Sequence, residues 1–260
     1  MNRRAGLIAL MMLACAPVRA QSLAFDATTV GGPASGMRAE LYMPTGVAAT
    51  AAVVVLHGCS GVGPHYRVWA AQLAQWGYAA LLVDSFRPRG FTEVCNRGSL
   101  VLPEVQARDA FDAAAYLRSR SDIRARRVGV IGFLHGGWAV LKAVLANVVR
   151  QAAEPPFTAA VAFYPGCDPP GAPLETDTLI LIGDSDDWTP LARCERWRDR
   201  VQTNGHSLQM KAYPGARHAF DAGASPHYFA GHYIGREPAA AADALAATRA
   251  FFAAHLGVRP

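Results

Sequence analysis

The sequence contains a glycine-flanked turn, a carboxylate and a histidine in the order that covalent hydrolytic catalysis uses. The turn is Gly132-Phe-Leu-His-Gly136, and it follows an apolar run that predicts a buried strand. Asp186 and His218 come later, each a few residues after another apolar run. A strand, a tight turn with small residues and a helix present a Ser or Cys nucleophile to a His base and to the acid that orients it. We therefore expect Asp186 and His218 to meet this turn in the folded protein.

The middle residue of the turn is Leu134, which has no nucleophilic atom. An acyl-enzyme mechanism needs an oxygen or a sulfur there, and a leucine side chain would fill the space of the scissile carbonyl. Three interpretations follow. A natural or engineered substitution has silenced a hydrolase, or the chain binds an ester-like or carboxylate ligand without turnover, or Ser60, Ser185 or Cys59 serves as nucleophile. We favour the first because the acid and the base remain, and disfavour the third because none of those residues lies on a strand–turn–helix.

The elements that must position these residues follow from hydrophobic periodicity. Continuous apolar runs predict strands buried on both faces, and they alternate with helical patterns, which indicates one α/β domain with a mostly parallel sheet. In such a sheet the reactive residues gather at the carboxyl ends of the strands. Two opening strands are expected at 22–29 and 37–43. The buried strands are expected at 51–56, 78–83, 128–131, 159–163, 178–182 and 208–213, and the helices at 66–76, 103–118, 136–149, 190–203 and 239–255.

Four motifs together resemble the dienelactone hydrolase family of α/β-hydrolases, and in particular its exported, cysteine-containing bacterial branch. They are His57-Gly-Cys-x-Gly61, Gly132-Phe-x-His-Gly-Gly-Trp138, Gly183-x-x-Asp-Asp-Trp-Thr-Pro190 and Pro214-Gly-Ala-x-His-Ala-Phe220. The resemblance extends from about Ala51 to the C-terminus. It implies a doubly wound hydrolase fold and a Cys or Ser nucleophile acting with Asp and His. It also implies a small-molecule carboxylic ester or lactone as substrate, with no metal and no cofactor.

The same resemblance assigns roles to individual residues. His218 would be the general base, and Asp186 would orient it. Asp187 is the alternative for the second role, although the spacing to the following Thr-Pro favours Asp186. The backbone N–H of His135 would be one donor to an oxyanion, and the loop around Cys59 would supply the other.

Three further residues are candidates for substrate binding: Arg87, Arg89 and Trp138. Either arginine would suit a substrate carboxylate, although an arginine in a polar loop is by default solvated. The dienelactone hydrolases proper have a glutamate near the oxyanion loop that masks the nucleophile. Here that loop is His-Gly-Cys-Ser-Gly, which argues against dienelactone itself as the substrate.

The N-terminus predicts export. A cationic start precedes an apolar run at 5–16, and Val18-Arg-Ala20 provides small residues for cleavage, so residues 1–20 are expected to be a signal peptide too short to span a bilayer. Cys15 as a lipoprotein acceptor is an alternative that its neighbours fit poorly. The mature domain would be 21–260, periplasmic or secreted. Its formal charge falls from +5 to +2 because three arginines leave with the signal, and nothing in it favours nucleic-acid binding.

Four cysteines remain in the mature chain: Cys59, Cys95, Cys167 and Cys194. An even number in an exported protein favours two disulfides, for which three connectivities are possible. We expect Cys59 to pair with Cys95, bracing the oxyanion loop, and Cys167 to pair with Cys194. The sequence has neither a C-x-x-C pair nor H-E-x-x-H, so a zinc site is not expected.

Overall fold

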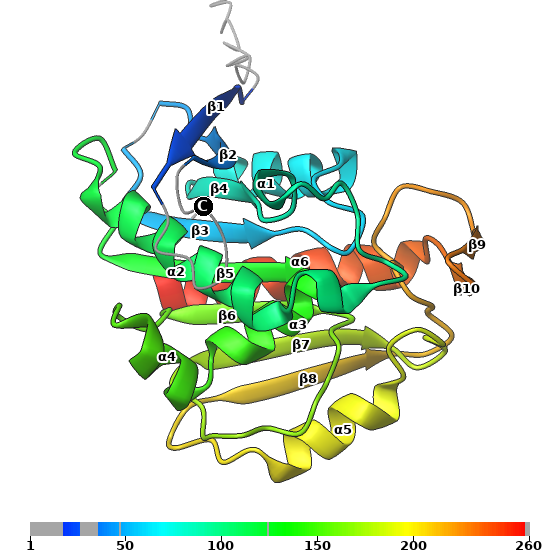
Figure 1. Cartoon of the computed structure of the whole chain (residues 1–260). Helices are drawn as coiled ribbons and strands as arrows, with labels where there is room; N and C mark the ends of the chain where they lie inside the picture. The colour runs from blue at the N-terminus through cyan, green and yellow to red at the C-terminus, as the bar shows by residue number, and fades with distance from the viewer. Residues whose placement is uncertain (1–17, 27–35, 47, 124, 258–260) are drawn as a thin grey trace, which may run out of the picture.

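Helices cover both faces of a central eight-stranded sheet (Figure 1). The computed structural model describes residues 18–26, 36–46, 48–123 and 125–257. Most of the expected signal peptide therefore lies outside the described residues, as does the end of the first expected strand.

The sheet has the strand order β1-β2-β4-β3-β5-β6-β7-β8. β1 and β2 are antiparallel to their neighbours, and the strands from β3 to β8 are parallel. The chain moves from β3 to one side and then returns to place β5 on the other, so the carboxyl ends of β3 and β5 flank the point where ligands bind in open α/β sheets. The strands are β1 Ala20–Phe25, β2 Met37–Tyr42, β3 Ala51–Leu56, β4 Ala79–Asp84, β5 Arg127–Phe133, β6 Ala159–Phe163, β7 Asp177–Gly183 and β8 Leu208–Tyr213.

α2 and α3 pack against each other on one face of the sheet, and α6 crosses the other face (Figure 1). Three helices have proline in their first turn, where the missing N–H costs no hydrogen bond. The helices are α1 Pro64–Gln75, α2 Pro103–Ser119, α3 His135–Ala143, α4 Ala146–Ala152, α5 Leu191–Arg200 and α6 Pro238–Leu256, with short 3₁₀ turns η1 Arg87–Arg89 and η2 Gly98–Leu100.

The single helix expected at 136–149 was wrong, because the structure has two helices there. Leu145 is extended, with φ −88° and ψ 137°, and separates α3 from α4. The N–H of Ala146 donates to the carbonyl oxygen of Pro173 at 2.9 Å. A tertiary hydrogen bond therefore replaces the helical one, which the apolar period of the sequence does not reveal.

A small hairpin that the sequence analysis did not predict follows β8. It consists of β9 His227–Phe229 and β10 His232–Ile234. Its two turn residues, Ala230 and Gly231, have φ values of 48° and 88°. A two-residue turn of this kind is usually signalled by Asn-Gly or Asp-Gly, and alanine at the first position gives no such signal.

The core lies between the sheet and its helices. Every residue of β3 is fully buried, which matches the continuous apolar run from which this strand was predicted. Each large aliphatic side chain buried in this way contributes about 1.5–3 kcal/mol to folding. Among the described residues, none of the helices has the length and apolar character that crossing a membrane requires.

Candidate active site

The turn between β5 and α3 holds Leu134 in an unusual backbone conformation, with φ 49° and ψ −106°. A non-glycine residue in a sparsely populated region costs about 1–3 kcal/mol. Its N–H donates to the carbonyl oxygen of Phe163 at 3.1 Å, and its carbonyl oxygen accepts from the N–H of Trp138 at 2.8 Å. The sharp turn is therefore retained although its central side chain is aliphatic.

Glycines allow the strand and the helix to meet at this turn. A Cβ atom at Gly132 would overlap the carbonyl group of Gly136, and one at Gly136 would overlap the carbonyl groups of Leu56 and His57. These neighbours are backbone atoms that cannot rotate away. The small residues expected from the sequence are therefore a steric requirement of the turn.

His218 and Asp186 form a buried pair. The two atoms His218 Nδ1 and Asp186 Oδ2 are 2.8 Å apart, and the residues are 2% and 4% exposed. The other carboxylate oxygen accepts the N–H groups of Trp188 and Thr189 at 2.9 and 2.8 Å. The Thr189 hydroxyl donates to Asp186 Oδ2 at 2.9 Å and also lies 3.3 Å from His218 Nδ1. Asp186 is thus held by several donors in the geometry that orients an imidazole.

Asp187, the alternative acid, points elsewhere. Its carboxylate is about half exposed, lies 3.4 Å from His232 Nδ1 and accepts the N–H of Tyr233 at 3.5 Å. The structure therefore brings Asp186, and not Asp187, into contact with His218.

The second ring nitrogen of His218 has no hydrogen-bond partner in the part of the chain that the structure describes. Nε2 is buried, and no hydrogen-bonding group of the described residues reaches it. The ring lies between Tyr164 and Trp188, with centroids 4.6 and 4.9 Å away. A serine hydroxyl or a cysteine thiol on the turn would normally donate to this nitrogen, whereas Leu134 cannot. Among the described residues, His218 Nε2 is therefore a buried acceptor or donor without a hydrogen bond.

Two backbone N–H groups are candidate donors to an oxyanion. Those of Cys59 and His135 donate to no backbone carbonyl group in the described part of the chain. They come from the loop after β3 and from the first turn of α3, next to Leu134. Paired N–H groups of this kind form the oxyanion hole of acyl-transfer enzymes.

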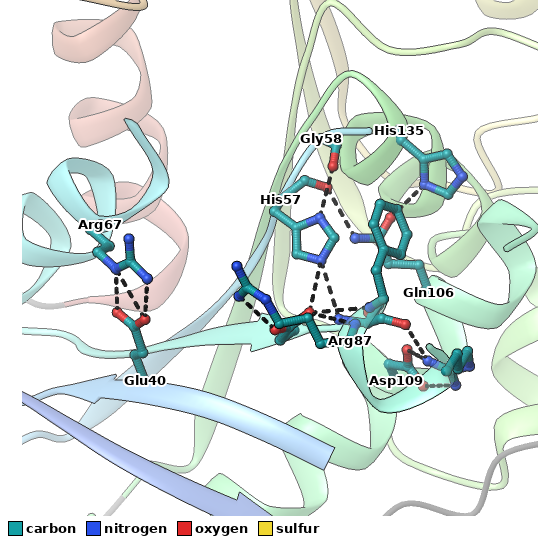
Figure 2. A network of polar contacts seen from close by, with 12 residues as sticks. Glu40, His57, Gly58, Arg67, Arg87, Gln106, Asp109 and His135 are labelled. Atoms are coloured by element: carbon teal, nitrogen blue, oxygen red, sulfur yellow. Dashed lines mark hydrogen bonds and ion pairs between the residues drawn. The ribbon is translucent and has the colours of Figure 1, made fainter. Parts of the chain in front are cut away.

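Gln106 ties these two segments together (Figure 2). Its amide donates to the carbonyl oxygen of His57 at 3.0 Å, and its oxygen lies 2.7 Å from His135 Nδ1. The N–H of Ser85 donates to His57 Nε2 at 3.2 Å, and burial lowers the pKa of His57 to about 4. The imidazole of His57, at the start of the loop that carries Cys59, is therefore neutral at pH 7.

A pocket of about 190 Å³ opens above Leu134. Most of its lining is apolar, with His135 and Thr189 as polar members. One edge is charged, where Arg193 Nη2 and Asp168 Oδ1 are 3.3 Å apart. Within the described residues, no group of three or more His, Cys, Asp or Glu side chains is arranged to hold a metal ion. The pocket is lined by Cys59, Val94, Cys95, Gly98, Leu134, His135, Trp138, Gly166, Asp168, Trp188, Thr189 and Arg193.

Of the three candidates for substrate binding, the structure places only Trp138 on this pocket. Arg89 forms a two-pronged ion pair with Asp109, with both N–O distances 2.8 Å. Arg87 pairs with Asp84 at 3.1 Å. Neither arginine is among the described residues that line the pocket, because each is held by a carboxylate near its own loop.

The expected disulfides are confirmed. Cys59 is bonded to Cys95, and Cys167 is bonded to Cys194. The first bond lies in the pocket wall, and the second joins the loop after β6 to α5, next to the charged edge. Both bonds therefore brace segments that shape the pocket.

A buried carboxylate that the sequence analysis missed anchors the loop of His218. Asp221 accepts hydrogen bonds from the Tyr164 hydroxyl and from Trp69 Nε1, both at 2.8 Å, and lies 3.3 Å from His65 Nε2. Burial opposes its ionisation, yet these neighbours hold the pKa of Asp221 below its usual value. Its place three residues after the histidine gave no signal, because its partners come from α1 and from the end of β6.

The strand order, the strained turn and the buried His–Asp pair together define a protein of the α/β-hydrolase fold. The chain belongs to the dienelactone hydrolase family, whose family model matches residues 37–256. By this membership the chain is related to hydrolases that act on small esters and lactones.

One curated protein and two solved structures illustrate what this chain is similar to. A protein of Bradyrhizobium sp., named probable 2-oxo-3-(5-oxofuran-2-ylidene)propanoate lactonase, is 26% identical over 213 residues, which are 77% of this chain and 85% of that protein. A dienelactone hydrolase-like promiscuous phosphotriesterase from metagenomic libraries superposes with a TM-score of 0.74 at 22% identity, covering 93% of this chain and 100% of that one. The dienelactone hydrolase of Anabaena variabilis gives 0.67 at 22% identity, covering 91% and 99%. The two solved structures support the fold.

Proposed function

We propose that this chain is a dienelactone-hydrolase-like hydrolase of small carboxylic esters or lactones in which Leu134 replaces the nucleophile, so that its activity as written is lost or very low. The observation that carries the proposal is the His218 imidazole. Nδ1 is bonded to Asp186, while Nε2 is buried without a hydrogen-bond partner among the described residues. The ring contacts Tyr164, which directly follows Phe163, the residue whose carbonyl oxygen accepts from the N–H of Leu134. The chain retains a base and its orienting acid, and lacks the group that the base would activate.

The mechanism of an active form follows from these contacts. A hydroxyl or thiol at position 134 would give its proton to His218 Nε2 and attack the substrate carbonyl carbon. The carbonyl oxygen would then take up negative charge, which the N–H groups of Cys59 and His135 would stabilise. Asp186 would stabilise the imidazolium. The intermediate would collapse and expel the alcohol, which takes the proton from His218. Water, giving a proton to His218, would then attack the acyl-enzyme, and the released carboxylic acid would leave the nucleophile free again.

The pocket suggests a small substrate. A cavity of about 150 Å³ holds one benzene ring, and this pocket has about 190 Å³. Its aromatic and disulfide walls suit an apolar ring or a short acyl chain. Trp138 would contact that group as part of the wall.

The test is to restore the nucleophile. Leu134→Ser and Leu134→Cys are assayed with a small activated ester and with a fluorophosphonate probe, beside the unmodified chain. Leu134→Ala is the matched control, because it removes the bulk of leucine without adding a nucleophile. We expect turnover and labelling at residue 134 with Ser or Cys only, and loss of turnover when His218→Gln is added. If neither Ser nor Cys gives esterase activity in a folded protein, the proposal is wrong.

The second candidate function is ligand binding without turnover. The observation that favours it is that the pocket remains open with the Leu134 side chain in its wall. A small ester or carboxylate that binds the unmodified chain tightly and is not consumed would support this alternative. Binding that requires Leu134→Ala would count against it.

We further propose that the protein is exported and works as residues 21–260 in the periplasm or outside the cell. Two disulfides support an oxidising compartment. Expression with the native leader and sequencing of the exported product should give an N-terminus at Gln21. A product that retains the leader in the cytoplasm would contradict this.

A further inference from the structure

We propose that the Cys59–Cys95 disulfide is a modification site for low-molecular-weight thiols. A thiol that enters the pocket would form a mixed disulfide with Cys95, while the Cys167–Cys194 disulfide stays intact. The proposal concerns the chain as it is, with Leu134 in place, and goes beyond ester hydrolysis.

The two disulfides differ in how accessible they are. Cys59 and Cys95 both line the pocket, whereas neither Cys167 nor Cys194 is among its described lining residues. Cys59, Cys167 and Cys194 are buried, at 5%, 5% and 0% exposure. Cys95 is partly exposed, and among the four cysteines that the structure describes it alone is not buried. Since the rate of thiol–disulfide exchange depends on access to the attacked sulfur, Cys95 is the sulfur that a thiol can reach.

The packing around the two disulfides also makes Cys59–Cys95 the easier one to open. Cys59 belongs to a small apolar cluster with Phe86, Val94 and Val101, which Cys95 only borders. Cys167 and Cys194 lie in the main hydrophobic core. Breaking the second disulfide would require the core to open, whereas the first is closed off only by a loop that contains no more than short 3₁₀ turns.

Loop length does not separate the two disulfides. They join residues 36 and 27 positions apart. The entropy of loop closure changes only with the logarithm of this separation, so both bonds restrict the unfolded chain to nearly the same extent. Access and packing are therefore what make one disulfide reactive and the other inert.

Complete opening of the Cys59–Cys95 disulfide consumes two thiol molecules. The first, as thiolate, attacks Cys95 Sγ; a new S–S bond forms, the Cys59–Cys95 bond breaks, and Cys59 leaves as a thiolate that takes a proton from water. A second thiol attacks the small thiol's sulfur, releasing Cys95 as thiolate and a small disulfide. Ser60 Oγ lies 3.4 Å from Cys95 Sγ, so its hydroxyl can donate to the departing Cys95 thiolate. The protein disulfide is reduced and the two thiols are oxidised.

Opening the disulfide would also affect catalysis in an active form, because Cys59 lies in the candidate active site. This consequence rests on the proposed function. Cys59 carries one of the two N–H groups that are candidate donors to the oxyanion. Without the disulfide, a hydrogen bond of 2.8 Å from the N–H of Val94 to the Cys59 carbonyl oxygen remains between the two loops. An active form should lose activity when the disulfide opens, because the position of that donor is then less constrained.

The first experiment uses the oxidised full chain. It is incubated with increasing 2-mercaptoethanol, quenched with acid, alkylated and mapped by mass spectrometry. We expect the adduct on Cys95 and the alkyl group on Cys59, at a rate at least about tenfold above any labelling of Cys167 or Cys194, because access governs the exchange. Equal rates at both disulfides, or an adduct first at Cys167 or Cys194, would overturn the proposal.

Two matched variants test the chemistry at Cys95. Ser60→Ala should prolong the lifetime of the mixed disulfide several-fold, whereas Ser99→Ala, an exposed serine of the same loop, should leave it unchanged. Equal lifetimes in both variants would remove Ser60 from the mechanism.

The activity arm uses Leu134→Ser. Thiol treatment that opens only the Cys59–Cys95 bond should lower its kcat/KM, and unchanged kcat/KM would refute the effect on catalysis. If Leu134→Ser is inactive, the proposed function fails, while the mapping of adducts on the unmodified chain still decides the modification site.

Discussion

At the scale of residues, the candidate site depends on which carboxylate faces the histidine. Spacing in the sequence favoured Asp186 over Asp187, and the structure shows why the two neighbours differ. The N–H groups of the following two residues turn back to one oxygen of Asp186, whereas Asp187 points towards the hairpin of β9 and β10. Of the two neighbouring carboxylates, only Asp186 therefore contacts the imidazole of His218.

The first prediction compares these two acids in the Leu134→Ser background. Asp186→Asn should lower kcat by about 10³–10⁴-fold, because an amide neither fixes the imidazole tautomer nor stabilises the imidazolium. Asp187→Asn is the matched control and should leave kcat little changed. Steady-state kinetics on a small activated ester measures both. Equal losses in the two variants would show that the acid has been assigned to the wrong residue.

Some residues of the site had no signal in the sequence. Gln106 lies on the buried side of α2 and contacts the loop after β3 and the turn after β5, segments far from it along the chain. Asp221 binds partners from α1 and from the end of β6. Such roles depend on tertiary neighbours, and one sequence shows only that a polar residue interrupts an apolar pattern. Arg87 and Arg89 are the converse case, since their loop placement suggested a ligand and the structure pairs each of them with a carboxylate.

At the scale of elements, the hydrophobic pattern predicted the positions of the sheet strands well. It did not predict where a tertiary hydrogen bond ends a helix. Every parallel strand was expected within a few residues of its observed position, because burial on both faces leaves a continuous apolar run. The break between α3 and α4 depends on a hydrogen bond to Pro173. The hairpin β9–β10 is too short and too exposed to carry a pattern.

The second prediction concerns the contact between β5 and α3. Gly132→Ala should destabilise the protein by about 3 kcal/mol or more, at or beyond the upper end of the range for overpacking, because its Cβ would overlap backbone atoms of Gly136. Gly171→Ala is the control, since no heavy atom lies within 4 Å of a Cβ built there. Urea unfolding of both variants measures the difference. A Gly132→Ala protein as stable as the control would show that strand and helix can separate at little cost.

At the scale of the whole molecule, the fold could be inferred from the sequence more completely than the chemistry. Eight strands, their parallel core and the disulfide pairing agree with expectation. Chain order alone places the acid and the base after later strands than the turn, and a parallel sheet brings all three to one edge. What the sequence could not show is that His218 Nε2 is buried with no hydrogen-bond partner among the described residues, because its surroundings arise only when these segments pack together.

The third prediction concerns the stability of the whole molecule in acid. Burial lowers the pKa of His57 from 6.5 to about 4, and burial also lowers the pKa of His135. Between about pH 6.5 and pH 4 the unfolded chain binds a proton at His57 that the native state does not, so stability falls as the pH falls through this range and levels off below it. For His57 alone the loss approaches about 3 kcal/mol.

Urea unfolding at pH 7, 5.5 and 4.5 measures this loss, and His57→Gln tests its origin. The variant should be less stable at pH 7, because the N–H of Ser85 loses its acceptor, but its stability should depend less steeply on pH. The test is therefore how steeply the free energy of unfolding changes with pH, and not its value at any one pH. A His57→Gln protein whose stability falls with pH as steeply as that of the unmodified chain would assign acid sensitivity to other groups. In that case the imidazole of His57 would be protonated in the native state.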